Sequence, residues 1–407
     1  MTSISEAPEQ QFRIGMLIYD TRYRSYTIQI IALMAFMLAA AWLINNAIVN
    51  LAVLGKTFSF GFLSQPASYD INQRLIDYTS RDTHARAALV GILNTLLVAV
   101  LGCLTATVIG TIAGVLRLSK NWLIARIMTV YVEAFRNVPV LIWILIVVAV
   151  INESLPVPRD YCRTPEQLDC LNPVLGSFVF TNRGFYMPIP VFQDAALAVG
   201  IAFVLSVAAI VWFRRYARAK QEATGQILPV FRISLAIFFL PSILVYFVAG
   251  MPIGLEYPKL QGFNFQGGIY ARDSLIGLWL ALSIYTGAFV AENVRAGIQA
   301  VSKGQTEAAF ALGIRPNRTM NLVILPQALR VIIPPLISQY LNLTKNSSLA
   351  IAVGYMDVTG TLGGITLNQT GKEMECILLL MAFYLAASLS ISAVMNWYNE
   401  RVKLRER

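Results

Sequence analysis

The sequence predicts an all-α integral membrane protein with about eight transmembrane helices, on the basis of three observations. Hydrophobic residues make up 57% of the 407 residues and charged residues only 13%, about half the charged share of a soluble protein. Apolar stretches of about 20 residues recur, the length that crosses a bilayer as a helix. Lysines and arginines lie just outside these stretches, so the net charge of +10 indicates membrane orientation and lipid contact, and no nucleic-acid partner is expected.

The N-terminal part of the chain is predicted to hold one span. Residues 1–26 are polar and carry Arg22 and Arg24 directly before the first apolar run, which predicts a cytoplasmic N-terminus. They contain no pattern of a cleavable signal peptide. The first span is expected over residues 27–44, and residues 45–87 are expected on the periplasmic side.

Residues 88–151 are predicted to form two spans. Small residues recur every four positions along the first span, where they share one helix face and allow close approach of a neighbour; they are Gly102, Ala106, Gly110 and Gly114. Proline removes a backbone hydrogen bond and restricts the residue before it, so a helix break is expected at Pro139. Arg136 lies just before this break and is either a functional residue or an anchor that reaches the membrane surface.

Residues 152–272 begin with a polar, proline-rich segment that is expected to be a periplasmic loop. Cys162 and Cys170 share this loop, and they are candidates for a disulfide if it faces an oxidising compartment. Two more spans are expected over residues 194–213 and 230–250. A basic cluster after the first of them marks a cytoplasmic end; it consists of Arg214, Arg215, Arg218 and Lys220.

Residues 273–398 are predicted to hold three further spans, followed by a basic cytoplasmic tail over residues 399–407. The second of the three is expected to be interrupted at Pro334 and Pro335, and again by polar residues over 344–348. Polar or irregular segments at membrane depth are tolerated only against protein or a water-filled cavity.

A short helical hairpin is predicted over residues 302–326, between two spans on the cytoplasmic side. Ser302 with Gln305 three residues later fits a capping box. Gly313 is placed to end the first helix in a left-handed conformation, and Pro316 suits the first turn of a second helix. The hairpin is either an ordinary cytoplasmic connection or a rigid device that enters a groove on a partner protein.

The hairpin resembles the EAA loop of ABC importer membrane subunits. The matching residues are Glu307, Ala308, Ala309, Gly313, Leu325 and Pro326, with Val323 where isoleucine is usual. The flanking sequences resemble the polar amino acid permease family, which includes histidine, glutamine and arginine permeases, over residues 88–151 and 273–398. The matching stretches are residues 131–139, 285–298, 303–306 and 345–349.

This resemblance implies a type I ABC importer permease core in a bacterial inner membrane. The family's usual unit has five spans, and the three additional spans here resemble those of the longer permease of general L-amino acid or glutamate/glutamine/aspartate/asparagine uptake systems. The resemblance implies that the chain forms half of a translocation pathway, in a heterodimer with a second homologous permease. It further implies two ATPase subunits, which bind ATP and Mg, and a periplasmic amino acid binding protein.

The resemblance also implies roles for individual residues. The contact that couples the permease to the ATPase is expected at Glu307, Ala308, Ala309 and Gly313. The chain has no phosphate-binding loop of the G-x-x-x-x-G-K-[ST] type, so it is expected to be a transport subunit without a cofactor or metal of its own, and not an enzyme.

Polar groups at membrane depth are candidates for the substrate path, because an amino acid needs donors for its carboxylate and acceptors for its ammonium group. They are Arg136, Asn137, Lys345, Asn346, Ser347 and Ser348. The alternative is that they pack the interface between two permeases. An ion-coupled secondary amino acid transporter is the rival function; it would usually carry acidic residues in mid-membrane, whereas Glu133 and Glu292 lie near the cytoplasmic ends of their spans.

Overall fold

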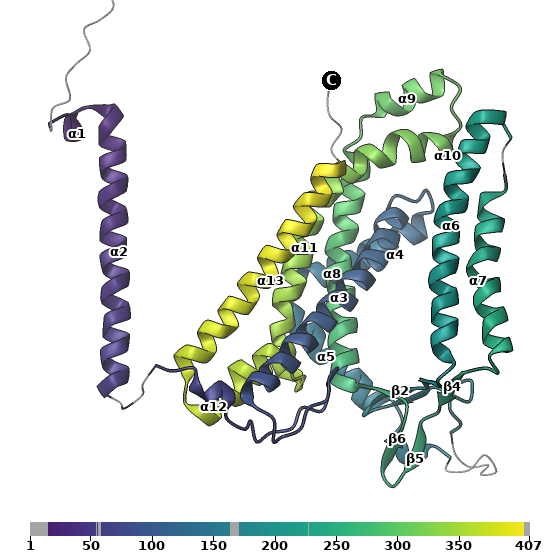
Figure 1. The fold of residues 1–407 in the computed structure, drawn as a ribbon. Coiled ribbons are helices and arrows are strands. Elements are labelled where there is room, and N and C mark those ends of the chain that lie inside the picture. Colours follow the sequence, from purple (N-terminus) through teal and green to yellow (C-terminus); the bar gives the residue numbers. More distant parts are fainter. Residues whose placement is uncertain (1–14, 54, 56–57, 163–170, 227, 403–407) are drawn as a thin grey trace, which may run out of the picture.

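The computed structural model describes the chain except for three short gaps, residue 227 and its two ends. The described residues are 15–53, 55, 58–162, 171–226 and 228–402. Within them, eight helices are long and apolar enough to cross a membrane, as the sequence predicts. Figure 1 shows them between two ends of the molecule, which we call the α9 end and the strand end after the elements found there. The spans lie in α2 (Thr21–Val53), α3 (His84–Arg117), α5 (Val140–Ser154), α6 (Ala196–Thr224), α7 (Val230–Val248), α8 (Asp273–Gln299), α11 (Leu325–Asn346) and α13 (Glu373–Val402).

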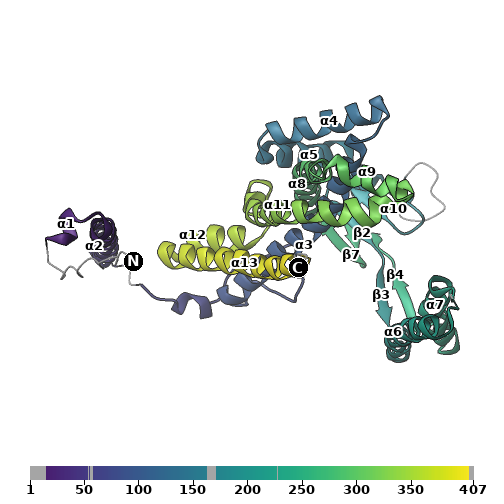
Figure 2. The same ribbon diagram turned by 90° about the horizontal axis from the view of Figure 1, so that it is seen from above.

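Shorter helical elements connect or extend these spans. They are α1 (Met16–Tyr19), η1 (Gly61–Ser64), α4 (Trp122–Asn137), η2 (Pro158–Asp160), α9 (Lys303–Ala311), α10 (Pro316–Thr319), η3 (Met320–Ile324), η4 (Ser347–Val353), η5 (Thr359–Thr366) and α12 (Leu367–Thr370). Span α2 stands apart from the others in both views (Figures 1 and 2), and none of its most apolar stretch is buried.

Helix α8 is the centre of the fold. It packs against α3, α4, α5 and α11, and 72% of its most apolar stretch is buried. A Cβ atom at Gly110 of α3 would lie 2.7 Å from the carbonyl oxygen of Gly287, and one at Gly114 would lie 2.6 Å from that of Ala291. The close approach predicted for the small-residue face of α3 is therefore confirmed at Gly110 and Gly114, against α8, whereas Gly102 faces Leu343 of α11.

The predicted helix break at Pro139 is also confirmed. Helix α4 ends at Asn137, Val138 is extended with φ −114° and ψ 137°, and α5 begins after Pro139. The rings of Phe135 and Trp143 stack across the break with centroids 4.0 Å apart. The break therefore joins two helices whose relative direction is held by an aromatic contact.

The strand end holds a feature that the sequence analysis did not predict. The described residues there form short strands: β1 (Val179–Thr181), β2 (Gly184–Met187), β3 (Ile189–Phe192), β4 (Ile253–Glu256), β5 (Lys259–Gln261), β6 (Asn264–Gln266) and β7 (Ile269–Arg272). Strand β2 pairs with β7 and β3 pairs with β4, both antiparallel. The chain thus leaves the core along one side of a ribbon and returns along the other. The α6–α7 hairpin lies at the far end of this ribbon, separate from the core in Figure 2.

A second unpredicted feature is a cap at the strand end, formed by residues 58–84. The hydroxyl of Tyr69 and Nδ1 of His84 each lie 3.0 Å from the hydroxyl of Thr366, next to α12. The backbone N–H of Ser59 donates to Glu375 at the start of α13, at 2.8 Å. These contacts fasten the segment after α2 onto the last part of the core.

Candidate coupling and pathway site

The hairpin that joins α8 to α11 begins and ends as the sequence predicts. The hydroxyl of Ser302 accepts a hydrogen bond from the backbone N–H of Gly304 at 3.3 Å, which caps α9. Gly313 has φ +70°. Its N–H donates to the carbonyl of Phe310, and the N–H of Ile314 donates to that of Ala309, so α9 ends in a Schellman motif.

The expected capping box at the start of α9 is wrong in one respect. The side chain of Gln305 does not turn back to the N-terminal residue of the helix. Its Oε1 instead accepts a hydrogen bond from Nε2 of Gln327 at 3.3 Å. This amide pair ties α9 to the beginning of α11, because the two residues lie on opposite arms of the hairpin. Hydrogen bonds therefore hold the hairpin both at its turn, through the Schellman motif, and at its open end, through the two glutamines.

The predicted coupling residues do not all reach the surface. Glu307, Ala308 and Gly313 are exposed, whereas Ala309 is only 4% exposed and faces the inside of the hairpin. The sequence analysis missed Phe310 and Leu312, whose side chains are 50% and 80% exposed. Large apolar side chains on an otherwise small-residue helix are the signal that would have identified them.

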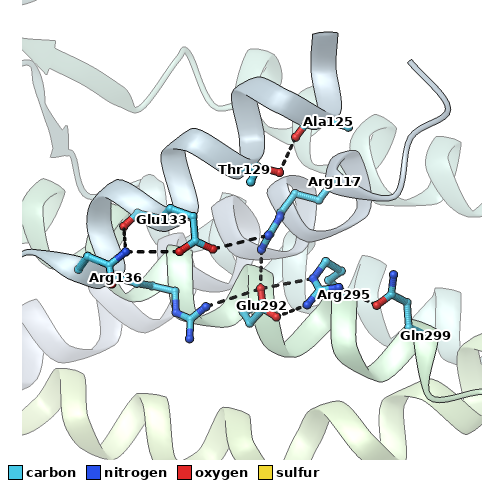
Figure 3. Close-up of polar contacts among 9 residues, drawn as sticks. Arg117, Ala125, Thr129, Glu133, Arg136, Glu292, Arg295 and Gln299 are labelled. Atoms are coloured by element: carbon cyan, nitrogen blue, oxygen red, sulfur yellow. Dashed lines mark hydrogen bonds and ion pairs between the residues drawn. The ribbon is translucent and has the colours of Figure 1, made fainter. Parts of the chain in front are cut away.

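An ion-pair network joins three helices near the α9 end (Figure 3). The carboxylate of Glu292 on α8 accepts hydrogen bonds from Arg295 on the same helix and from Arg117 on α3. Nη1 of Arg136 on α4 lies 3.8 Å from the same carboxylate. Glu133 on α4 completes the network, 3.9 Å from Nη2 of Arg117. Because the side chain of Arg117 is only 10% exposed, the loss of its partners would leave a charge with little water around it.

Two of the predicted substrate-path residues take part in these internal contacts. Arg136 pairs with Glu292 and also lies over the ring of Phe289, with Cζ 5.6 Å from the centroid. The amide of Asn137 donates to the backbone carbonyl of Glu133 at 2.8 Å. Both residues therefore stabilise the end of α4 and its contact with α8.

The other path candidates lie at the end of α11. The hydroxyls of Ser347 and Ser348 donate to the carbonyls of Thr344 and Lys345, each at 2.7 Å. Lys345 is exposed, and it makes no ion pair with any of the described residues. Among the described residues, no hydrogen bond or ion pair connects the candidates at the end of α11 to Arg136 or Asn137. The structure thus separates the candidates into two places.

The shape of α11 differs from the expectation. The interruption predicted at Pro334 and Pro335 is wrong, because α11 runs through both prolines. The second interruption is a change of helix type, from α-helix to the tighter η4 after Asn346. Exposed polar residues follow one face of α11 at spacings of four and three residues; they are Ser338, Asn342 and Lys345. The sequence analysis missed the first two, which this spacing would have revealed.

The predicted disulfide between Cys162 and Cys170 lies partly outside the described residues. Cys170 lies outside them, so its pairing with Cys162 stays a prediction. The backbone N–H of Cys162 donates to the carbonyl of Leu171 at 3.0 Å. The two ends of the intervening segment are therefore adjacent.

Sequence similarity to known proteins extends over the whole chain. Residues 223–405 match the family model described as binding-protein-dependent transport system inner membrane component. The chain is 54% identical over 429 residues to the glutamate/glutamine/aspartate/asparagine transport system permease protein BztB of Rhodobacter capsulatus, with 100% of both chains covered. It is 45% identical over 396 residues to the general L-amino acid transport system permease protein AapQ of Rhizobium johnstonii, covering 97% of this chain and 96% of the relative. The chain therefore belongs to the family of binding-protein-dependent transport system inner membrane components, as a multi-pass permease subunit.

Proposed function

We propose that this chain forms one half of the translocation pathway of an ATP-driven amino acid importer. The observation that carries the proposal is the α9 hairpin, a short helix with a cap at its start and a Schellman motif at its end. It presents Glu307, Ala308, Phe310 and Leu312 at the surface. A helix fixed at both ends transmits a displacement, whereas a flexible loop would absorb it.

The partner at this hairpin is an ATPase subunit with a groove for α9, one for each permease of the importer. ATP and Mg bind to that subunit, and closure of two ATPase subunits moves the hairpin. The exposed side chains of Phe310 and Leu312 support this role, because their burial in a groove would supply binding energy from apolar area. The charge bias of the sequence supports a cytoplasmic α9 end with both termini on that side.

The ion-pair network carries the displacement into the membrane. Helix α9 follows α8 after a three-residue connection, and Glu292 of α8 binds Arg117 of α3 and lies close to Arg136 of α4. A push on α9 would thus move α3, α4 and α8 together. The small-residue contact between α3 and α8 adds to this stiffness, since the two backbones touch without long side chains between them.

The pathway lies along the exposed polar face of α11, against a second, homologous permease in a heterodimer. Ser338, Asn342 and Lys345 would be costly against lipid, and a water-filled path or a protein partner satisfies them. Lys345 would bind the carboxylate of a passing amino acid. A periplasmic binding protein would select the amino acid and deliver it, and the names of both relatives support an amino acid as the substrate.

The rival function, ion-coupled transport, has less support from the site. A proton- or cation-coupled carrier needs a carboxylate that is free to bind and release its ion. Glu292 and Glu133 are instead paired with arginines, whose positive charges already balance theirs.

A reconstitution experiment tests the proposal. The chain is purified with an affinity tag in mild detergent, and co-purified permease, ATPase and binding proteins are identified by mass spectrometry. The assembly is then placed in liposomes, and uptake of labelled glutamate and glutamine is measured with ATP inside. We expect uptake that requires ATP and persists with an uncoupler. Uptake that is lost on adding the uncoupler at constant ATP would instead support the ion-coupled rival.

A further inference from the structure

The α6–α7 hairpin carries a cluster of arginines that neither the coupling hairpin nor the pathway uses. The two helices pack on each other, and only 6% of the most apolar stretch of each is buried. The ribbon of β3 and β4 holds them apart from the core (Figure 2). Their outward sides expose large apolar side chains such as Leu197, Val204 and Phe239, as expected of helices surrounded by lipid chains.

The arginines lie at the level of the lipid headgroups. Arg214 comes 18 residues after the start of α6 at Ala196, a rise of about 27 Å at the spacing of an α-helix. This distance is close to the thickness of the hydrocarbon core, about 30 Å. Arg232 lies near the start of α7, which returns from the same level. Both helices thus place guanidinium groups where the apolar layer ends.

The four arginine side chains of this cluster are exposed. Ser206 and Ala217 are the buried positions of α6. Arg215 lies about 200° around the helix from Ala217, and the cluster as a whole is exposed: Arg214, Arg215, Arg218 and Arg232. The structure shows none of the four in a hydrogen bond or ion pair with any residue that it describes. Their charges are therefore available to an outside ligand.

Aromatic side chains accompany the arginines at the same level. The rings of Trp212 and Tyr216 stack with centroids 5.8 Å apart, and both are exposed, as is Phe231 at the start of α7. Tryptophan and tyrosine are enriched where hydrocarbon meets headgroups. Glu222 is the only acidic residue between positions 211 and 232, so little opposes the positive field.

We infer that this end of the α6–α7 hairpin is a binding surface for anionic phospholipid headgroups. Guanidinium groups bind phosphate through paired hydrogen bonds, and clusters of cations next to a membrane span attract anionic lipids. The exposed aromatic rings and apolar sides fit the acyl chains of the same lipids, which a free phosphate ion does not have. The surface thus anchors the hairpin, which the ribbon of β3 and β4 joins to the core.

Lipid retention by the purified full-length protein tests this inference. The protein is equilibrated in mixed micelles with equal amounts of phosphatidylglycerol and phosphatidylcholine, and retained lipids are quantified by mass spectrometry. We expect the wild type to enrich phosphatidylglycerol, by roughly fivefold for each arginine engaged. The variant R214Q/R215Q/R218Q/R232Q should retain the two lipids equally, whereas the corresponding lysine variant should keep the preference because it keeps the charge.

Two controls distinguish lipid binding at this surface from the effect of exposed charge elsewhere on the protein and from binding of free phosphate. The variant R81Q/K259Q removes two exposed cations from the strand end and should keep the enrichment of the wild type. Inorganic phosphate should displace no more lipid than sodium chloride of equal ionic strength; greater displacement would indicate a phosphate site and overturn the inference. A glutamine variant that still enriches phosphatidylglycerol would also overturn the inference. If the glutamine variant does not fold, the salt dependence of the wild type provides the test. A phosphatidylglycerol enrichment by the wild type that salt does not affect would contradict binding through exposed charges.

Discussion

The carboxylate of Glu292 on α8 accepts a hydrogen bond from the guanidinium of Arg117 at the end of α3, although 175 residues separate them in sequence. The same carboxylate pairs with Arg295 and lies 3.8 Å from Nη1 of Arg136 on α4. One side chain therefore joins three helices (Figure 3). Its position near the end of α8, a short way before α9, places it between the coupling hairpin and the core of the permease.

Replacement of Glu292 by glutamine should destabilise the protein. The change leaves the guanidinium groups of Arg117, Arg136 and Arg295 close together without the carboxylate that they share. We expect a loss of about 2 kcal/mol in the free energy of unfolding, less than for a fully buried pair because the Glu292 side chain is 23% exposed. Thermal unfolding in detergent measures the effect. Glu133→Gln is the matched control: its side chain is 53% exposed and 3.9 Å from Arg117, so it should cost much less. Equal losses would contradict the central role of Glu292.

Replacement of Gly313 by valine should abolish uptake while the protein still inserts into the membrane. Its φ of +70° suits glycine, and a β-branched residue there costs of order 1–3 kcal/mol of local strain. We expect α9 to lose its Schellman motif and its fixed direction. Uptake and the amount of protein in the membrane are measured together. Gly304→Ala is the control, because a Cβ atom there meets only the Ser302 hydroxyl at 3.6 Å. Normal uptake by the valine variant would argue against rigid coupling.

Truncation of the two exposed apolar residues of the hairpin should weaken the binding of the ATPase. Phe310→Ala and Leu312→Ala remove side chains that are 50% and 80% exposed in the isolated chain, so the stability of the chain itself should change little. Each is expected to weaken binding by about 1–3 kcal/mol if the partner buries it. Binding of the ATPase to immobilised permease measures this. Leu255→Ala, which removes an exposed leucine from β4 at the strand end, should bind as the wild type does; an equal loss there would point to a non-specific effect.

Lys345→Ala should lower substrate uptake by about tenfold or more, the usual effect of losing a hydrogen bond to a charged group. Lys345→Arg keeps the positive charge and should retain most of the uptake. Uptake and substrate-stimulated ATP hydrolysis are measured in liposomes. Lys120→Ala, in the exposed turn between α3 and α4, is the control. Wild-type behaviour of the alanine variant would favour the alternative in which Lys345 packs at the interface between permeases.

The sequence patterns predicted those elements that are determined by residues close together in the sequence. Apolar length predicted the eight spans, the missing N–H of Pro139 predicted the break before α5, and glycine at position 313 predicted the end of α9. The ribbon was missed because its strands have only three or four residues, too few for alternation to show. The pairing of Glu292 with Arg117 was missed because it depends on how α3 and α8 meet, which no spacing within either helix reveals.

Asp357 should make the stability of the protein fall as the pH rises. Its side chain lies between η4 and η5 and is fully buried, and burial raises the pKa of its carboxyl group from 3.8 to about 7. Between these values the unfolded chain releases a proton that the folded protein keeps, so the free energy of unfolding decreases as the pH rises through this range and stays low above it. Asp357→Asn removes the titration and keeps the oxygen that accepts from the N–H of Gly360 at 2.8 Å. We expect the variant to melt at a higher temperature than the wild type at pH 8 and at a similar one near pH 4.

Asp82 provides a control of opposite sign for this pH dependence. The N–H of Thr79 donates to its carboxylate at 2.7 Å, and this bond lowers the pKa of Asp82 from 3.8. A lowered pKa stabilises the folded protein above the unfolded value, and this stabilisation is lost as the pH falls through the folded value. Asp82→Asn should therefore be less stable than the wild type at neutral pH and approach it in acid. If melting temperatures showed the same trend for both variants, burial at Asp357 would not be the cause of its pH dependence.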